Sequence, residues 1–223
     1  MKKIILIIGL ICCATFLQAQ STFLDIGQSG IRATAFAQES YWEDGFMGSL
    51  GYSFNGTFDI SAWAGSYKYD HMQAGGDDID QTETAYGANI TWWFKRCSPG
   101  YERLINIGIR TGYEYEEYKV DDKKSATSNG FEGCAVFAIN FDICNMCAMQ
   151  PFYSLGYSMT TMEEEASGDK EDYNGAISSY GVNLVRNIGD NTKLHFTFET
   201  DNDALHKTND VAYEFGAGVV YGF

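Results

Sequence analysis

The chain has 223 residues, enough for one domain, and a net charge of −15 at pH 7. It contains 15 Tyr, 15 Phe and 24 Gly but only 2 Pro, which favours a β-barrel over a helical bundle. The negative charge argues against a nucleic-acid partner, because phosphate binding relies on clustered Lys and Arg.

The first twenty residues, "MKKIILIIGLICCATFLQAQ", have the layout of a secretory signal peptide. Two lysines precede an apolar run, and small and polar residues follow it. The run is shorter than the roughly 20 residues that a transmembrane helix needs. We expect cleavage after Ala19, so that residues 1–19 are a signal peptide and residues 20–223 form one domain. Cleavage after Gln20, or a lipid anchor on a cysteine of the run, are the alternatives.

Segments in which apolar and polar or small residues alternate follow along the whole chain, as expected for β-strands. In chain order these segments are 29–38, 46–54, 57–69, 84–95, 104–118, 130–142, 150–160, 176–185, 193–200 and 211–223. They predict ten strands, each close to the roughly 9–11 residues with which a tilted strand crosses a bilayer. Eight strands, with the N-terminal segment outside the wall, is the alternative.

The connections between these segments alternate in length. Short turns are expected at Asn55-Gly56, which favours a type I′ hairpin, and at 96–103, 143–149 and 186–192. The other connections, most of them longer, are expected at 39–45, 70–83, 116–129, 162–174 and 201–210. Short periplasmic turns and longer outer loops are typical of bacterial outer-membrane barrels, and an even strand number puts both termini in the periplasm.

Alternation alone does not separate a membrane barrel, with its apolar face outward, from a soluble sandwich, with that face inward. The signal peptide and the small or charged residues on the opposite face favour the barrel. Aromatic residues near the strand ends are expected to form interfacial girdles. These residues are Tyr67, Tyr69, Trp92, Trp93, Tyr113, Tyr115 and Tyr221.

The chain ends in a strand whose alternate residues are apolar or aromatic up to a terminal Phe. Those residues are Tyr213, Phe215, Ala217, Val219, Tyr221 and Phe223. This strand resembles the assembly signal of Gram-negative outer-membrane barrels, which the barrel-assembly machinery reads in those families. The whole pattern is similar to small barrels of the opacity-protein and outer-membrane-protein-A transmembrane kind. The resemblance implies an all-β, closed, antiparallel up-and-down transmembrane barrel in the outer membrane, in contact with lipid and lipopolysaccharide.

Charged residues on the face opposite the apolar one are expected to line the barrel interior. They are Arg32, Asp59, Arg110, Glu114, Glu132, Glu199 and Glu214. Side chains largely fill the interior of a barrel of this size, and buried charges are tolerated only when paired. We therefore expect a polar and ionic network and a structural or surface-interaction role. The surplus of carboxylates leaves a narrow, cation-preferring pore as the alternative.

No catalytic residue, cofactor or metal site is expected. His71 and His206 fall in outer loops, but the Asp pair and the Asp–His pair of omptin-type proteases cannot be matched. His195-Phe196-Thr197 has Thr where lipid A deacylases carry Ser. A rim hydrolase is therefore only a minor alternative. The acidic loops lack the spacing of a calcium loop, so they are expected to be solvated surface, open to an extracellular ligand that the sequence does not identify.

Four cysteines follow the signal peptide: Cys97, Cys134, Cys144 and Cys147. Cys144 and Cys147 form a C-x-x-C, but the surrounding pattern is not that of a thioredoxin-like motif. In an oxidising periplasm we expect a disulfide, either Cys144–Cys147 or Cys97 with one of them, while Cys134 stays unpaired. A zinc site from Cys97, Cys144 and Cys147 is a minor alternative, because no His lies nearby.

Overall fold

Strands make up almost all of the computed structural model, which describes residues 23–39, 43–69, 73–74, 77–78, 81–96, 105–121, 123–144, 146–203 and 212–223. The strands are β1 Gly30–Glu39, β2 Glu43–Phe54, β3 Phe58–Tyr69, β4 Gln73–Ala74, β5 Asp77–Asp78, β6 Gln81–Lys95, β7 Ile105–Val120, β8 Lys123–Ile139, β9 Phe141–Cys144, β10 Cys147–Glu164, β11 Lys170–Asn187, β12 Thr192–Asp203 and β13 Ala212–Gly222. Within these ranges, no helix is long and apolar enough to cross a bilayer.

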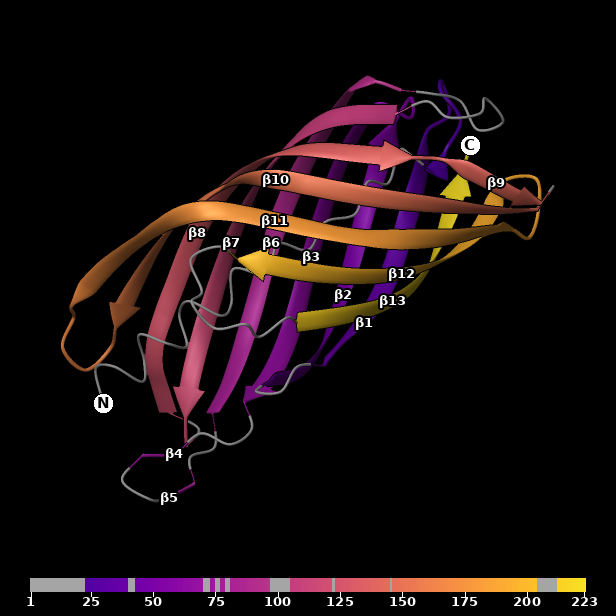
Figure 1. Cartoon of the computed structure of the whole chain (residues 1–223). Helices are drawn as coiled ribbons and strands as arrows, with labels where there is room; N and C mark the ends of the chain where they lie inside the picture. The colour runs from indigo at the N-terminus through magenta and orange to yellow at the C-terminus, as the bar shows by residue number, and fades with distance from the viewer. Residues whose placement is uncertain are drawn as a thin grey trace.

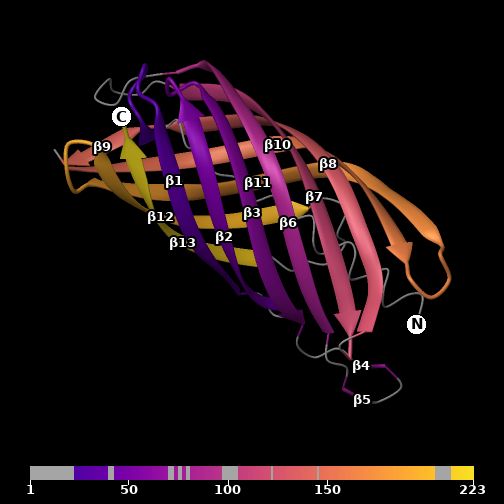
Figure 2. The same ribbon diagram turned by 180° about the vertical axis from the view of Figure 1, so that it is seen from behind.

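Ten of these strands form one closed antiparallel wall (Figures 1 and 2). The order is β11-β12-β13-β1-β2-β3-β6-β7-β8-β10, and β10 pairs again with β11. Strand β1 closes the wall. It pairs with β2 on one side and with β13, the last strand of the chain, on the other. The prediction of a ten-stranded barrel is confirmed, and the eight-stranded alternative is excluded. The short strand β9 pairs with the start of β10, and β4 and β5 form a separate hairpin.

Residues alternate between the two faces of the wall, apart from register shifts at Trp93/Lys95 and Tyr118/Lys119. On β13, Tyr213, Phe215 and Tyr221 are exposed, whereas Glu214 and Val220 are buried. This follows from strand geometry, in which successive side chains point to opposite faces. The face of each residue is therefore fixed once one residue of its strand has been placed.

The turn between β2 and β3 has the geometry that its sequence predicts. Asn55 and Gly56 have φ angles of 50° and 62°, and the Thr57 backbone N–H donates to the Phe54 carbonyl oxygen at 3.0 Å. Two successive positive φ values are the signature of a type I′ turn, whose twist matches that of the flanking strands. The predicted hairpin is confirmed.

Two of the predicted outer loops are wrong. Residues 116–129 lie mainly in β7 and β8, which are joined directly after Val120, and residues 162–174 lie mainly in β10 and β11. The outer face of these segments carries charged side chains such as Glu117, Lys119 and Lys124, so the sequence loses the apolar alternation that marks the other strands. Backbone pairing continues without an apolar face. The wall is consequently taller along β7, β8, β10 and β11, which have 16 to 18 residues, than along β1, which has 10.

Candidate functional site in the barrel wall and interior

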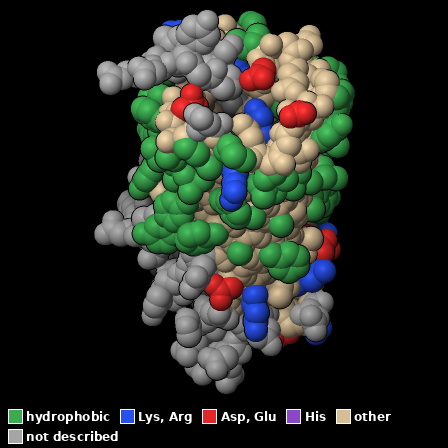
Figure 3. All heavy atoms as spheres, turned by 90° about the vertical axis from the view of Figure 1, so that its right-hand side faces the viewer, with side chains coloured by type: hydrophobic (Ala, Val, Ile, Leu, Met, Phe, Trp, Pro, Cys, Tyr) green, Lys and Arg blue, Asp and Glu red, His purple; other side chains and the backbone are tan. Residues whose placement is uncertain are grey.

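Large apolar side chains form a band on the outside of the barrel. Phe46, Leu50 and Met159 leave 69%, 67% and 60% of their surface exposed. Figure 3 shows the hydrophobic side chains gathered around the middle of one face, with most charged side chains above and below them. The exposed residues of β13 and the Phe223 that follows it run from Tyr213 to Phe223, a rise of about 33 Å along the strand or about 25 Å along the axis of a tilted barrel. That height matches the apolar band of a membrane barrel.

The residues of the C-terminal signal lie on this outer face. The exposed members are Tyr213, Phe215, Val219, Tyr221 and Phe223. Their strand is the one that closes the wall against β1, with Gly222 opposite Gly30. The strand that the sequence marks as an assembly signal is thus also the closing strand.

The predicted aromatic girdle is only partly present. Four of its members lie on the outer face: Trp92, Tyr113, Tyr115 and Tyr221. The prediction is wrong for three others, which are buried on the inner face: Tyr67, Tyr69 and Trp93. Trp93 directly follows Trp92 on a strand, so the two rings must point to opposite sides of the wall.

All seven predicted interior residues lie on the inner face. Arg32, Asp59, Arg110, Glu114, Glu199 and Glu214 are buried. The Glu132 side chain is 10% exposed. Two groups form around the guanidinium groups of Arg110 and Arg32.

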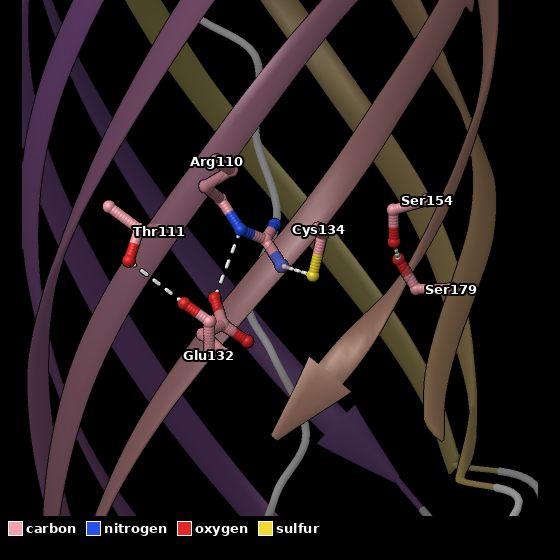
Figure 4. Close-up of polar contacts among 6 residues, drawn as sticks. All are labelled: Arg110, Thr111, Glu132, Cys134, Ser154 and Ser179. Atoms are coloured by element: carbon pink, nitrogen blue, oxygen red, sulfur yellow. Dashed lines mark hydrogen bonds and ion pairs between the residues drawn. The ribbon is translucent and has the colours of Figure 1, made fainter. Parts of the chain in front are cut away.

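The first group surrounds Arg110 on β7 (Figure 4). Its Nε lies 3.0 Å from Glu132 Oε1, and its Nη2 donates to Cys134 Sγ at 3.3 Å. Both partners are on β8, where Cys134 is directly opposite Arg110 and Glu132 is opposite Gly112. A Cβ on Gly112 would lie 2.9 Å from Glu132 Oε1, so the glycine makes room for the carboxylate. The strand register therefore builds a buried ion pair with a thiol beside it.

The second group surrounds Arg32 on β1. Asp59 and Glu199 are the carboxylates whose negative charge acts on its guanidinium group. Asp59 also accepts a hydrogen bond at 3.1 Å from the indole Nε1 of Trp93. These residues come from β1, β3, β6 and β12, so the group gathers side chains from four strands of the wall.

Neutral polar side chains on β10, β11 and β12 form hydrogen bonds with one another inside the barrel. The Ser154 and Ser179 hydroxyls are 2.9 Å apart (Figure 4). Asn183 donates to Gln150 Oε1 at 3.2 Å and accepts from the Thr197 hydroxyl at 2.7 Å. Buried polar groups need such partners, because an unmade hydrogen bond in the interior is costly.

The sequence interpretation missed two interior carboxylates, Glu83 and Glu116. Tyr69 donates a hydrogen bond to Glu83 Oε2, and Tyr118 donates to Glu116 Oε2 at 2.5 Å. Glu83 ends the predicted outer loop 70–83, and Glu116 begins the predicted outer loop 116–129. Continuing the alternation two residues at a time beyond Arg110 would have put Glu116 and Tyr118 on the inner face.

Apolar side chains also fill the interior, which the predicted polar network did not include. One buried cluster contains Trp93, Cys134, Val136, Ala138, Phe152 and Ile177. Another contains Phe36, Met47, Trp63, Tyr67 and Ala85. The described interior is therefore packed by aromatic and aliphatic groups as well as by ion pairs.

The segment that precedes β1 packs against one end of the wall. Phe23 and Leu24 are buried and form a cluster with Val185 and Val220. Their carbonyl oxygens accept hydrogen bonds from basic side chains. Lys193 Nζ donates to the Phe23 carbonyl at 2.5 Å, and Arg96 Nη2 donates to the Leu24 carbonyl at 2.8 Å. This end of the barrel is covered by the chain itself.

The histidines and cysteines are placed as follows. His71, His206 and Cys97 lie outside the described residues. His195 is buried on the inner face, with its Nε2 3.1 Å from the Thr34 hydroxyl. Cys144 and Cys147 are opposite each other at the β9–β10 turn and are present as thiols. Because Cys97 is not described, the disulfide and its pairing stay a prediction. Among the described residues, no group of three His, Cys, Asp or Glu could hold a metal ion.

Neither a protein-family model nor a curated protein sequence matches this chain. Solved outer-membrane barrels do resemble it in structure. The translocator domain of the autotransporter NalP from Neisseria meningitidis has a TM-score of 0.54 and 11% identity, over 89% of this chain and 90% of that one. Neisserial surface protein A has a TM-score of 0.38 and 12% identity, over 87% and 97%. The outer membrane protease OmpT from Escherichia coli has a TM-score of 0.38 and 10% identity, over 88% and 96%. At these identities the similarity concerns the barrel fold alone.

Proposed function

We propose that this chain is an integral outer-membrane protein with a structural or surface-interaction role, whose interior is closed by its own side chains. The observation that carries the proposal is a closed ten-stranded wall with an apolar outer band and a packed interior. In hydrocarbon, only a closed sheet satisfies the backbone groups of every strand. An apolar band on the outside of such a wall is costly in water and favourable in lipid.

Three features of the proposed location rest on the sequence. Residues 1–19 act as a signal peptide that is removed on export. The C-terminal strand is read by the barrel-assembly machinery through Tyr213, Phe215, Val219, Tyr221 and Phe223. The short turns and both termini face the periplasm, so that the tall part of the wall projects from the cell.

The proposed surface role belongs to the ends of β7, β8, β10 and β11. Ion pairs there lie on solvent-facing positions, such as Lys124 with Glu165 at 3.2 Å and Lys170 with Glu163 at 3.0 Å. Exposed pairs of this kind contribute little to stability, so the charges are free to serve recognition. The partner would be an extracellular ligand that complements an acidic surface.

Conductance across a planar bilayer tests the closed interior. The purified barrel, folded in detergent and inserted, should give no stable current steps under conditions in which a 16-stranded porin gives large ones. Heat-modifiable migration on a gel should show in parallel that the inserted protein is folded. Reproducible steps from the folded protein would contradict a closed interior.

A narrow cation-preferring pore is the second candidate function, and the charge of the interior favours it. The two arginines Arg32 and Arg110 face seven carboxylates on the described inner wall: Asp59, Glu83, Glu114, Glu116, Glu132, Glu199 and Glu214. Such a surplus attracts cations into a narrow passage. Reproducible current steps would establish this alternative if their reversal potential in a KCl gradient has the sign expected when K⁺ permeates more easily than Cl⁻.

A further inference from the structure

The turn between β9 and β10 brings two cysteines together at one end of the barrel (Figure 1). Cys144 ends β9, Cys147 begins β10, and the two are register partners across the hairpin. Cys144 is exposed and Cys147 is half-buried, so reagents in solution can reach them. The two side chains are also hydrogen-bonded to each other. The C-x-x-C pattern is thus a facing pair of thiols rather than two isolated side chains.

A positive charge lies beside this pair. Arg186 on β11 is the register partner of Cys147, so the three residues form one row across neighbouring strands. Its charge acts on both sulfurs. A nearby cation favours the thiolate, which is the form that attacks disulfides.

The two sulfurs are not equivalent. The backbone N–H of Met146, together with the Cys147 thiol, donates to the Cys144 sulfur and lowers the pKa of that thiol. The same thiol–thiol hydrogen bond raises the pKa of Cys147. When the pair loses a proton, the negative charge therefore favours Cys144, the more exposed sulfur.

We propose that the Cys144-Asn-Met-Cys147 hairpin is a thiol–disulfide exchange site, with Cys144 as the attacking thiol and Cys147 as the resolving thiol. Its substrates are disulfides of small thiols and of proteins that can reach the barrel end. This goes beyond the proposed envelope role, and it does not depend on whether the interior conducts. It also differs from a structural disulfide, because the bond is made and broken reversibly.

The exchange balances in atoms and electrons. The Cys144 thiolate attacks one sulfur of a substrate disulfide, and the other substrate sulfur leaves as a thiolate that takes up a proton. Cys147 then loses its proton and attacks Cys144 Sγ, which expels the second substrate thiolate. The hairpin dithiol has lost two electrons and two protons to become a disulfide, and the substrate disulfide has become two thiols.

Glutathione is the probe for a direct test. The folded, detergent-solubilised protein carrying Cys97→Ser is equilibrated in buffers of different reduced-to-oxidised glutathione ratio, quenched with acid, alkylated and analysed by mass spectrometry. The hairpin should pass from dithiol to disulfide as the ratio changes. Cys134 is buried beside Arg110 and should stay a thiol throughout, which makes it an internal control.

Single-cysteine variants test the two roles. Cys147→Ser should accumulate a mixed disulfide with glutathione on Cys144, about tenfold faster than Cys144→Ser does on Cys147, since rate follows the thiolate fraction. Arg186→Gln should slow the reaction of Cys144 several-fold, and Arg186→Lys should restore it. Heat-modifiable migration checks that each variant is folded.

Three results would overturn the proposal. The hairpin disulfide could remain intact at every glutathione ratio, which marks a structural bond. It could remain a dithiol at every ratio, which marks an inert pair. Finally, the two serine variants could react at the same rate, in which case neither sulfur has the attacking role.

Discussion

Arg110 and Glu132 are held on neighbouring strands inside the barrel, with their charged atoms 3.0 Å apart. Replacing Arg110 with Met should lower the free energy of unfolding by about 3–5 kcal/mol, because it leaves a buried carboxylate without its cation. Urea unfolding of the barrel in lipid vesicles measures this change. Met keeps an unbranched apolar stem at this position and removes the guanidinium group, so the main change is the loss of the cation.

Two variants separate these causes. The double variant Arg110→Met with Glu132→Leu removes both charges and should recover most of the lost stability. The exposed pair Lys170–Glu163 supplies the control, because Lys170→Met should leave the free energy of unfolding unchanged. Equal losses in the single and double variants would show that the charge pair is not what holds this part of the interior.

At the residue scale, the sequence predicts side-chain direction better than side-chain environment. The seven charged residues assigned to the interior do face it, because strand alternation admits only two directions. Trp93 and Tyr69 face the interior although an aromatic residue near a strand end is typical of an interfacial girdle, because alternation along the strand, and not residue type, decides the face. The strand register, which decides that Arg110 meets Glu132 and Cys134, could not be read from one strand at a time.

Leu50 represents the outer band at the scale of a strand. It lies on β2, and 67% of its surface is exposed. Leu50→Arg should lower the free energy of unfolding in vesicles by about 2–4 kcal/mol if this face meets hydrocarbon near the middle of the bilayer. A matched change in the β10–β11 turn, Ser167→Arg, should have little effect. If the two substitutions cost the same, the face of β2 that carries Leu50 is in water.

Two glycines with positive φ give a matched test of the β2–β3 turn. Gly56 has φ +62°, and a Cβ there would lie 2.6 Å from the Asp25 carbonyl oxygen, whereas Gly168 has φ +68° with open space around it. Gly168→Ala should cost about 1 kcal/mol from backbone strain alone. Gly56→Ala should cost more, because it also displaces the segment at Asp25. Equal costs by urea unfolding would contradict that contact.

At the element scale, the sequence predicts which segments are strands but not where they end. Beyond Tyr115 the outward-facing residues of β7 are charged, as in the pair Glu117–Lys119, although hydrogen bonding continues to Val120. A polar stretch of this kind reads as a loop in sequence. The short turn at Asn55-Gly56 is the opposite case, since its conformation is dictated locally.

At the scale of the whole molecule, closure of the wall decides which side is apolar. The sequence alternation fits both a sandwich and a barrel. Pairing of β1 with β13 leaves one continuous outer surface, and the large exposed side chains lie on it. The packed interior, with its two apolar clusters, could not be predicted because its members meet only across the closed barrel.

Quenching of tryptophan fluorescence by brominated lipid tests this arrangement most directly. Trp92 and Trp93 are neighbours in sequence, but Trp92 is 56% exposed on the outer face and Trp93 is 2% exposed on the inner face. Two variants are prepared in lipid vesicles, each keeping one of these residues and carrying Phe in place of the other three tryptophans. Bromine on the acyl chains should strongly quench Trp92 and leave Trp93 almost unchanged. Absence of quenching for Trp92, or equal quenching of both residues, would contradict a barrel that presents its apolar face to lipid.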